Sequence, residues 1–240
     1  MISCEYCYHQ AVSDTEEHRP PPSLTDEDID ALSNVGSRVR FPAGSVLIQE
    51  GEQTDFVLYI SDGHITIVRT VGERTAPMTF LRGTGTLVGE MSAVTGQARI
   101  ASVRALTDVT AWIIPGAAWL DFLHQRPPAM FTLLHHTMKR LGETTAKAAD
   151  SLLGSEQKFA KLLLDLVAHG LTDPHDGAQV VRFTQQELAD FTGVSRESLT
   201  QAIKHLKSLH ILSTGRQKLY LHNIPSLEVI AAGKPGTAES

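Results

Sequence analysis

The chain of 240 residues contains only two cysteines, Cys4 and Cys7, and aromatic residues make up just 6% of it. Two cysteines cannot build a disulfide framework, so we expect a hydrophobic core to hold the fold. Long apolar runs are also missing, because the most apolar stretch, AWIIPGAAWL, is short and is broken by Pro115 and Gly116. The acidic amino terminus lacks the zones of a signal peptide, which predicts a cytoplasmic protein with no membrane partner.

Basic residues are in the minority, with 21 Lys and Arg against 27 Asp and Glu, a net charge of -6. That balance argues against a nucleic-acid partner until its distribution is considered. Residues 1–37 hold eight acidic residues and one basic residue, a net of -7, so the rest of the chain carries +1 (-6 minus -7). Residues 191–218 hold five basic residues and one acidic residue, a net of +4. A local basic patch attracts phosphates whatever the global sum.

Changes in composition divide the chain into four parts and predict an α+β fold. Residues 1–23 are polar and acidic, which is typical of a flexible tail. Short period-two apolar segments with regular glycines fill 38–114 and predict an antiparallel, jelly-roll-like β-roll within a sensor domain over 24–127. We expect a long central helix over 128–153 and a winged helix-turn-helix domain over 154–240.

Two hydroxyl side chains are placed to begin helices around these parts. Thr25 precedes three acidic residues, which are favourable at the positive end of a helix. Ser155 precedes the apolar segment KFAKLLLDLVAHG, which we expect to form a helix that Gly170 ends.

The central helix carries an apolar seam with residues spaced 3, 4, 3, 4, 3 and 4 apart. Its members are Phe131, Leu134, Met138, Leu141, Thr145, Ala148 and Leu152. A helix lying on the roll would also show one apolar stripe. We favour a homodimer interface, because the 3.5-residue period persists for three heptads without drifting to 3.6.

Residues 184–209 predict two helices joined by a tight turn. Thr184 and Glu187 have the spacing of a capping box, Gly193 supplies the turn, and Ser195 can cap the second helix. In a helix-turn-helix the second helix enters the major groove of DNA with its first residues on base edges.

The second helix has one apolar face and one polar face. Leu199, Ile203 and Leu206 fall on the buried side, and the hairpin STGRQKLYLHN that follows is predicted to be a wing. A solvated helix pair without a ligand is the alternative interpretation. The candidate DNA-binding residues are Thr184, Ser195, Arg196, Glu197, Ser198, Thr200, Gln201, Lys204, Arg216 and Lys218.

Three segments resemble the cyclic AMP receptor protein / fumarate-nitrate regulator superfamily of bacterial transcription factors. They are FPAGSVLIQEGEQTDFVLYISDGHI, LVGEMSAVTGQARIASVRAL and TQQELADFTGVSRESLTQAIKHLKSLHIL. The resemblance implies a cyclic-nucleotide-binding type of roll and a homodimer on palindromic double-stranded DNA, with RNA polymerase as a further partner. It also implies that the central helix transmits the signal of the roll to the DNA-binding domains.

The resemblance assigns roles within the reading helix. Arg196 and Glu197 match the family's guanine- and cytosine-contacting pair, and Ser195 and Ser198 match phosphate or positioning contacts. Gln201 stands where the cyclic AMP receptor has an arginine, so we expect a related but altered half-site.

The resemblance also implies an effector site in the roll. Glu90 matches the ribose-binding glutamate, Arg99 matches the partner of the cyclic phosphate, and Thr144 and Thr145 match the residues that face the nucleobase. The candidate effector-binding residues are Gly89, Glu90, Met91, Arg99, Ile100, Ala101, Thr144 and Thr145.

Ile100 departs from the pattern, because the cyclic AMP receptor has a phosphate-binding serine there. Losing a charge-assisted hydrogen bond costs about 1.5–3 kcal/mol, roughly ten- to a hundredfold in affinity. Two interpretations stay open: a cyclic nucleotide binds more weakly or in another pose, or the pocket is vestigial or takes another ligand, with Arg99 in a structural ion pair. The cofactor is therefore unknown.

Other sensors and an enzyme are weaker hypotheses. Cys4 and Cys7, with nearby histidines, are a weak candidate for metal or redox sensing, and two cysteines do not fit a four-cysteine iron–sulfur cluster. His64 either binds haem, as a roll histidine does in some relatives, or lies in solvent at a turn. No catalytic motif is evident, so an enzyme is not expected. A cyclic-nucleotide-binding module without DNA is the least favoured reading.

Overall fold

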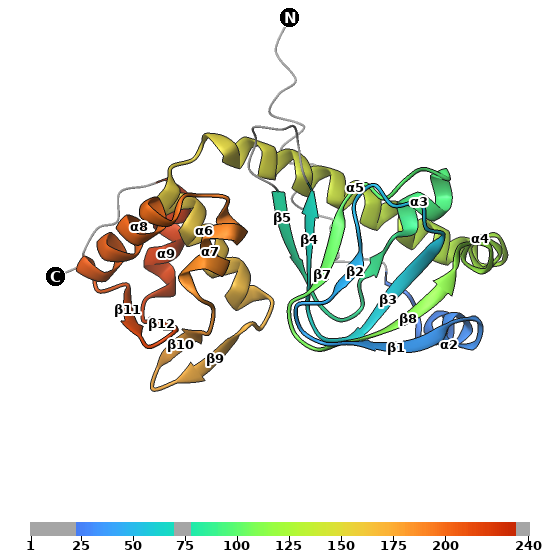
Figure 1. Cartoon of the computed structure of the whole chain (residues 1–240), viewed down its shortest axis with the longest axis horizontal. Helices are drawn as coiled ribbons and strands as arrows, with labels where there is room; N and C mark the ends of the chain where they lie inside the picture. The colour runs from blue at the N-terminus through green and yellow to red at the C-terminus, as the bar shows by residue number, and fades with distance from the viewer. Residues whose placement is uncertain (1–22, 70–77, 234–240) are drawn as a thin grey trace, which may run out of the picture.

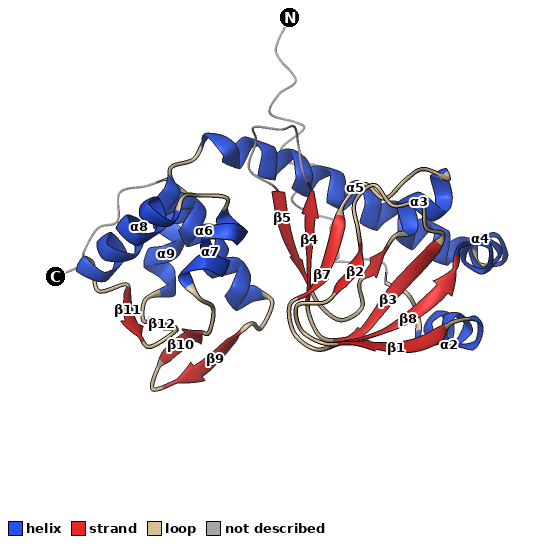
Figure 2. Cartoon of the chain, viewed as in Figure 1, coloured by secondary structure: helices blue, strands red, loops and turns tan. Residues whose placement is uncertain are grey.

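The computed structural model describes residues 23–69 and 78–233, and it shows two bodies joined by one long helix (Figure 1). The amino-terminal body is a β-roll with short helices at one end, and the carboxyl-terminal body is a helical domain with a small sheet (Figure 2). None of the described helices has both the length and the apolar character that a membrane span requires.

The roll consists of two antiparallel four-stranded sheets, in the orders β1-β8-β3-β6 and β2-β7-β4-β5. Its strands are β1 (Ser37–Phe41), β2 (Val46–Ile48), β3 (Phe56–Asp62), β4 (Ile65–Arg69), β5 (Met78–Arg82), β6 (Leu87–Val88), β7 (Ser102–Ala105) and β8 (Val109–Pro115). The alternating apolar residues of both sheets meet in one core, which includes Leu58, Ile60 and Ile65. The predicted antiparallel roll is confirmed.

Three short helices close the roll: α2 (Asp26–Val35), α3 (Glu90–Thr95) and α4 (Gly116–Gln125). Thr25 caps α2 as predicted, because its hydroxyl accepts from the backbone N–H of Asp28 and the Asp28 carboxylate accepts from Thr25. Asp28 also accepts from Arg126, at 2.9 Å, and this ion pair ties α2 to the start of the central helix.

The central helix α5 runs over Pro127–Ala149 along the roll, beside β4 and β5 (Figure 1). The predicted helix over 128–153 is too long at its carboxyl end, because a 3-10 turn, η1 (Asp150–Leu152), follows Ala149. Asp150 pairs there with Lys161 of the next helix, and Leu153 is extended. The last predicted seam residue, Leu152, therefore lies outside the α-helix.

The carboxyl-terminal domain contains four helices and a four-stranded antiparallel sheet in the order β11-β12-β10-β9 among the described residues. Its elements are α6 (Ser155–Ala168), β9 (Thr172–His175), β10 (Ala178–Val181), α7 (Gln185–Thr192), α8 (Arg196–Ser208), β11 (Leu212–Gly215), β12 (Lys218–Leu221) and α9 (Ile224–Ala231). The predicted helix, turn, helix and hairpin are present, and with the roll they confirm the α+β fold.

The start of α6 differs from the sequence prediction. Gly154, not Ser155, is the N-cap, and its backbone N–H donates to Oε1 of Gln157 at 3.2 Å. The side chain of Gln157 thus caps the helix in place of the expected serine, and Ser155 is the first helical residue.

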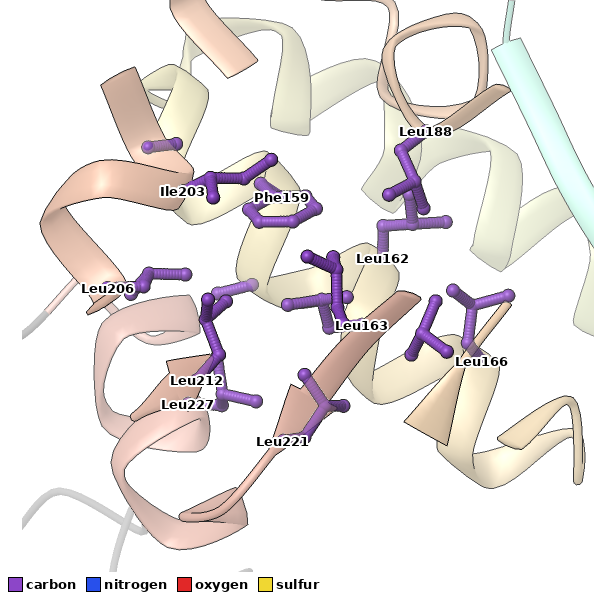
Figure 3. Packing of buried hydrophobic residues seen from close by; sticks show 14 of the residues in the cluster. Phe159, Leu162, Leu163, Leu166, Leu188, Ile203, Leu206, Leu212, Leu221 and Leu227 are labelled. Carbon is purple, nitrogen blue, oxygen red and sulfur yellow. The ribbon is translucent and has the colours of Figure 1, made fainter. Parts of the chain in front are cut away.

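The core of the carboxyl-terminal domain forms around α6. Leucines from α7, α8, β12 and α9 converge on Phe159, Leu163 and Leu166, which are fully buried (Figure 3). Leu81 of β5 is a buried member of the same cluster, although it belongs to the roll. The β4–β5 hairpin is therefore packed against the carboxyl-terminal domain.

Candidate DNA-reading surface and effector cavity

The reading helix α8 begins with the cap that the sequence predicts. The hydroxyl of Ser195 accepts from the backbone N–H of Ser198 at 3.1 Å. Gly193 ends α7 in the left-handed conformation, with φ of 66°, which a glycine adopts without strain. This turn fixes the angle between α7 and α8 and leaves the first turn of α8 exposed.

The polar face of α8 carries side chains without partners. Arg196, Glu197, Gln201 and Lys204 are exposed, and none of their side chains makes a hydrogen bond or ion pair among the described residues. On the opposite face, Leu199 and the other apolar residues are buried in the core. The helix is thus held firmly from one side while its other side stays available to a partner.

The remaining predicted DNA-binding residues surround this face or support it. Thr184 is spent on the capping box with Glu187 at the start of α7, and the Thr200 hydroxyl donates to the Arg196 carbonyl. Arg216 lies in the exposed turn of the β11–β12 hairpin, and Lys218 begins β12. The basic hairpin has the position of a wing beside the reading helix (Figure 1).

The roll contains a cavity of about 130 Å³ between the β2-β7-β4-β5 sheet, α3 and α5. Seven of the eight predicted effector residues line it, and the exception is Thr145, which is exposed on another side of α5. The seven are Gly89, Glu90, Met91, Arg99, Ile100, Ala101 and Thr144.

Arg99 is bound by the protein itself. Its Nε donates to the Thr54 hydroxyl at 2.8 Å, Nη1 to the Gly89 carbonyl at 2.8 Å and Nη2 to the Phe56 carbonyl at 2.7 Å. The residue is only 3% exposed, and its desolvation lowers the pKa, although a guanidinium stays charged. The sequence-based alternative of a structural ion pair is wrong, because neutral oxygens hold the side chain.

Gly89 makes this arrangement possible. Its φ is +87°, and a Cβ atom there would lie 2.6 Å from Nη1 of Arg99. Only glycine combines this backbone conformation with so close an approach. Gly89 therefore leaves the space that the Arg99 guanidinium occupies.

Glu90 is buried and paired with Arg140 of the central helix. Arg140 also donates through Nη2 to the Leu87 carbonyl at 2.6 Å. The pair joins α3 to α5, so any change at Glu90 reaches the helix that leads to the DNA-binding domain.

The opening of the cavity is partly apolar. Ile100 is 41% exposed and Met91 is also exposed, and neither offers a hydrogen-bond donor from its side chain. Thr144 uses its hydroxyl hydrogen on the Arg140 carbonyl at 2.8 Å, which leaves it able to accept from a ligand.

Several cavity residues could not be identified from the sequence motif. Arg69 and Arg82 enter from the paired strands β4 and β5, together with Ile67 and Phe80, and Arg140 enters from α5. The only sequence signal was the period-two alternation of these strands, which does not say which face meets the cavity.

A second cavity, of about 790 Å³, lies between the roll, α5 and the carboxyl-terminal domain. Phe80 and Arg82 line it as well as the first cavity. Lys147 and Asp165 both line this cavity and attract each other electrostatically. Desolvation lowers the pKa of Lys147 and raises the pKa of Asp165.

His64 forms another link between the two bodies. Its Nε2 lies 2.8 Å from the His169 carbonyl at the end of α6, and because a carbonyl only accepts, Nε2 carries the proton. The expectation of a solvent-exposed turn histidine is therefore wrong, since the ring is partly buried in an interdomain contact.

The weak metal candidates Cys4 and Cys7 lie outside the described residues. Within 23–69 and 78–233, no group of three or more His, Cys, Asp or Glu side chains is arranged to hold a metal ion.

One face of α5 is apolar and uncovered in the single chain. Phe131, Leu134, Met138 and Leu141 are all more than half exposed, and Thr145, Ala148 and Leu152 are exposed beside them. These are the predicted seam residues, and contiguous apolar surface of this kind marks an interaction site.

A β-roll with an arginine-lined cavity, a long central helix and a helix-turn-helix with an exposed polar face define the class of a DNA-binding transcription regulator. Residues 38–126 match the model of the cyclic nucleotide-binding domain, and residues 157–230 match the Crp-like helix-turn-helix domain. The chain belongs to the CRP/FNR family of transcription regulators. The predicted family and the predicted function as a sequence-specific DNA-binding regulator are confirmed.

Two relatives and two solved structures show the extent of the similarity. The CRP-like cAMP-activated global transcriptional regulator of Mycobacterium tuberculosis is 28% identical, covering 73% of this chain and 79% of the relative. The cAMP-activated global transcriptional regulator CRP of Salmonella typhimurium is 25% identical, covering 72% and 84%.

Among solved structures, a CRP/FNR-family regulator from Thermus thermophilus has a TM-score of 0.71 at 25% identity. The c-di-GMP responsive global regulator CLP of Xanthomonas campestris has a TM-score of 0.73 at 22% identity. Each alignment covers 83% of this chain and all of the other chain. At 22% identity the likeness to CLP concerns the fold.

Proposed function

We propose that this regulator acts as a homodimer joined along the apolar face of α5. Six residues in heptad spacing are exposed on that face, and the seventh, Leu152, is exposed in the 3-10 turn that follows. This exposure would be costly for a chain that remained single. Two-fold symmetry places two copies of α8 on successive turns of the same side of a DNA duplex, so the operator is a palindrome.

Sequence recognition falls to the free polar side chains of α8. Arg196 has the fork of donors that suits O6 and N7 of guanine, Glu197 can accept from N4 of cytosine, and Gln201 can pair with adenine. Ser195, Ser198, Thr200 and Lys204, with Thr184 and the wing residues Arg216 and Lys218, contact or position phosphates. The observation that carries this proposal is the exposure of Arg196, Glu197 and Gln201, whose side chains make no hydrogen bond or ion pair among the described residues.

The roll cavity is the effector site of this proposal. The two relatives are cAMP-activated by name, and the cavity keeps the residues that match the phosphate and ribose partners. Ile100 supplies no donor and Arg99 is already bound, so cyclic AMP binds weakly or a different anionic ligand binds instead. RNA polymerase as a partner, a cytoplasmic location and the absence of catalysis remain predictions.

DNA binding tests the central proposal directly. A labelled palindromic duplex is titrated with wild-type protein and with Arg196→Ala at several salt concentrations, followed by fluorescence anisotropy. We expect specific binding that weakens steeply with salt and a loss of about 1–3 kcal/mol per half-site in the variant. Arg38→Ala, an exposed arginine on β1, is the matched control. A dimer that ignores every palindromic duplex would contradict the proposal.

The weakness of cyclic AMP binding has its own test. Ile100→Ser restores a hydroxyl donor at the opening of the cavity, and we expect about ten- to a hundredfold tighter cyclic AMP binding by calorimetry. Ile100→Ala removes the same apolar bulk without adding a donor and is the control. Equal, tight binding by wild-type protein and Ile100→Ser would remove the argument.

A further inference from the structure

The effector cavity holds more positive charge than a cyclic mononucleotide needs. Four arginines line it, Arg69, Arg82, Arg99 and Arg140, against one carboxylate, Glu90. The lining therefore carries a formal charge of +3, from four guanidinium groups and one carboxylate. A cyclic mononucleotide brings a single negative charge.

Two of the four arginines are committed to the fold. Arg140 is paired with Glu90, and Arg99 donates to the Thr54 hydroxyl and to two backbone carbonyls. A phosphate that approached Arg99 would meet a guanidinium with three donors already in use. The anion-binding capacity of the cavity must come largely from its other wall.

The β4–β5 hairpin provides that other wall. Ile67 pairs with Phe80, and Arg69 and Arg82 each lie two residues further along their own strands. Side chains two residues apart lie on the same face of a strand, so both arginines share the face that Ile67 and Phe80 turn toward the cavity. Two guanidinium groups therefore flank one apolar pair.

The arginines on this wall have replaceable partners. Arg82 is paired with Glu143 of α5 and donates through Nη1 to the Leu81 carbonyl. The Glu143 side chain is 35% exposed, against 5% for Glu90, so Glu143 can move into water at little cost. Arg69 is exposed and has no partner among the described residues.

We propose that the effector is a small ligand with at least two phosphate charges, one of which displaces Glu143 from Arg82. The inference rests on the proposed function of the roll cavity and names the ligand class. A phosphate oxygen can accept from Nη2 of Arg82 as the Glu143 carboxylate does, so the exchange replaces one ion pair by another. The second phosphate charge lies toward Arg69, which has no partner among the described residues.

The exchange also connects the two cavities. The centre of the Phe80 ring lies 5.7 Å from Cζ of Arg82 and 5.6 Å from Nζ of Lys147. Phe80 and Arg82 line the interdomain cavity as well. Once displaced, Glu143 lies one turn from Lys147 on α5, where a side-chain pair is favourable. Ligand binding thereby changes the charges that face the carboxyl-terminal domain.

A charge series of ligands tests the proposal by calorimetry at fixed pH and ionic strength. The probes are cyclic AMP, 5′-AMP and ADP, which share one base, and cyclic di-GMP, which carries two separated phosphodiesters. We expect at least one multiply charged probe to bind roughly tenfold or more tightly than cyclic AMP. Arg82→Gln should weaken binding of the multiply charged probes more than binding of cyclic AMP, and so remove that advantage.

The direction in which Glu143→Gln changes the affinity for multiply charged probes is the decisive result. The substitution removes the group that competes with the ligand, so multiply charged probes should bind more tightly to this variant than to wild-type protein. A structural role of the Arg82–Glu143 pair alone would leave the affinity unchanged or weaken it. Arg38→Gln, on β1 of the other sheet, controls for the general loss of a positive charge.

Three outcomes would overturn the proposal: cyclic AMP binding at least as tightly as every other probe, no binding of any probe, or weaker binding by Glu143→Gln. Circular dichroism shows whether each variant is folded. If Arg82→Gln does not fold, Arg69→Gln and Glu143→Gln still decide the matter. Binding of a multiply charged probe by a protein that ignores DNA would leave this inference standing and contradict the proposed function.

Discussion

The reading helix and the effector cavity use polar side chains in opposite ways. On α8, Arg196, Glu197 and Gln201 face solvent and bind nothing else in the described chain. In the cavity, Arg99 and Glu90 are buried and already held by protein groups. The polar side chains of α8 can bind a partner without breaking any internal bond. Those of the cavity must exchange internal bonds for bonds to a ligand.

The difference explains why the two sites respond differently to mutation. Removing a polar side chain from α8 leaves no unsatisfied group behind, so stability should change little and DNA binding should change much. Removing a polar side chain from the cavity leaves its former partner without a hydrogen bond, so stability and ligand binding should change together.

The largest expected effect lies beneath the reading face. Leu199 is 0% exposed, and Leu199→Ala should lower the free energy of unfolding of the carboxyl-terminal domain by about 2–5 kcal/mol, because it leaves a cavity. Urea denaturation followed by circular dichroism measures this. Val94→Ala, at an exposed position of α3, should stay within about 0.5 kcal/mol. Similar losses in both variants would show that α8 is not anchored by this core.

The same substitution in both regions tests the comparison most directly. Glu90→Gln leaves the partly buried guanidinium of Arg140 without its carboxylate and should cost about 1.5–3 kcal/mol of unfolding free energy. Glu197→Gln should cost less than about 0.5 kcal/mol but change the preferred base in an operator selection experiment. Equal effects on stability would break the comparison.

Asp28, another buried and internally bonded side chain, should make the stability of the roll depend on pH. Burial raises the pKa of Asp28, but hydrogen bonds from Thr25 and the charge of Arg126 outweigh it, so the net shift is downward. A folded-state pKa below the unfolded one gives stability that is complete above the unfolded pKa near ~3.9 and is lost as pH falls through the folded pKa.

We therefore expect Asp28→Asn to lower the free energy of unfolding by about 1 kcal/mol at pH 7 and by progressively less below about pH 4. Thermal melts across this range measure the difference. Asp30→Asn, exposed on the same helix, is the control. A difference that grew on acidification would mean that the pKa of Asp28 is raised in the folded protein.

The smallest expected effect lies between the two regions. His64→Ala removes the hydrogen bond to the His169 carbonyl and should cost about 0.5–1.5 kcal/mol. Scanning calorimetry should show the roll and the carboxyl-terminal domain unfolding further apart in temperature. His64→Gln, whose amide can donate to the same carbonyl, should retain part of the coupling. Unchanged transitions in His64→Ala would mean that this hydrogen bond does not couple the two bodies.

Much of the carboxyl-terminal site was predictable because its interactions are local. The caps at Thr184 and Ser195 span three residues, and the turn at Gly193 needs only one backbone conformation. The predicted Ser155 cap was wrong because the helix begins one residue earlier, with Gly154 as the N-cap and its N–H donating to the Gln157 side chain. The predicted end of α5 was wrong because the helix stops before Asp150, which forms an ion pair with Lys161 of a different helix.

The sequence by itself determined the order of elements, the capped helices of the DNA-reading motif and the apolar seam of α5, since each depends on periodicity or on hydrogen bonds between near neighbours. Only the tertiary structure decided the chemistry of the cavity. Arg99 reaches Thr54 across 45 positions, Arg140 reaches Glu90 across 50 and Arg82 reaches Glu143 across 61. Whether an arginine meets a carboxylate, a carbonyl or water is set by which distant segments pack beside it, and that determines which charges remain for a ligand.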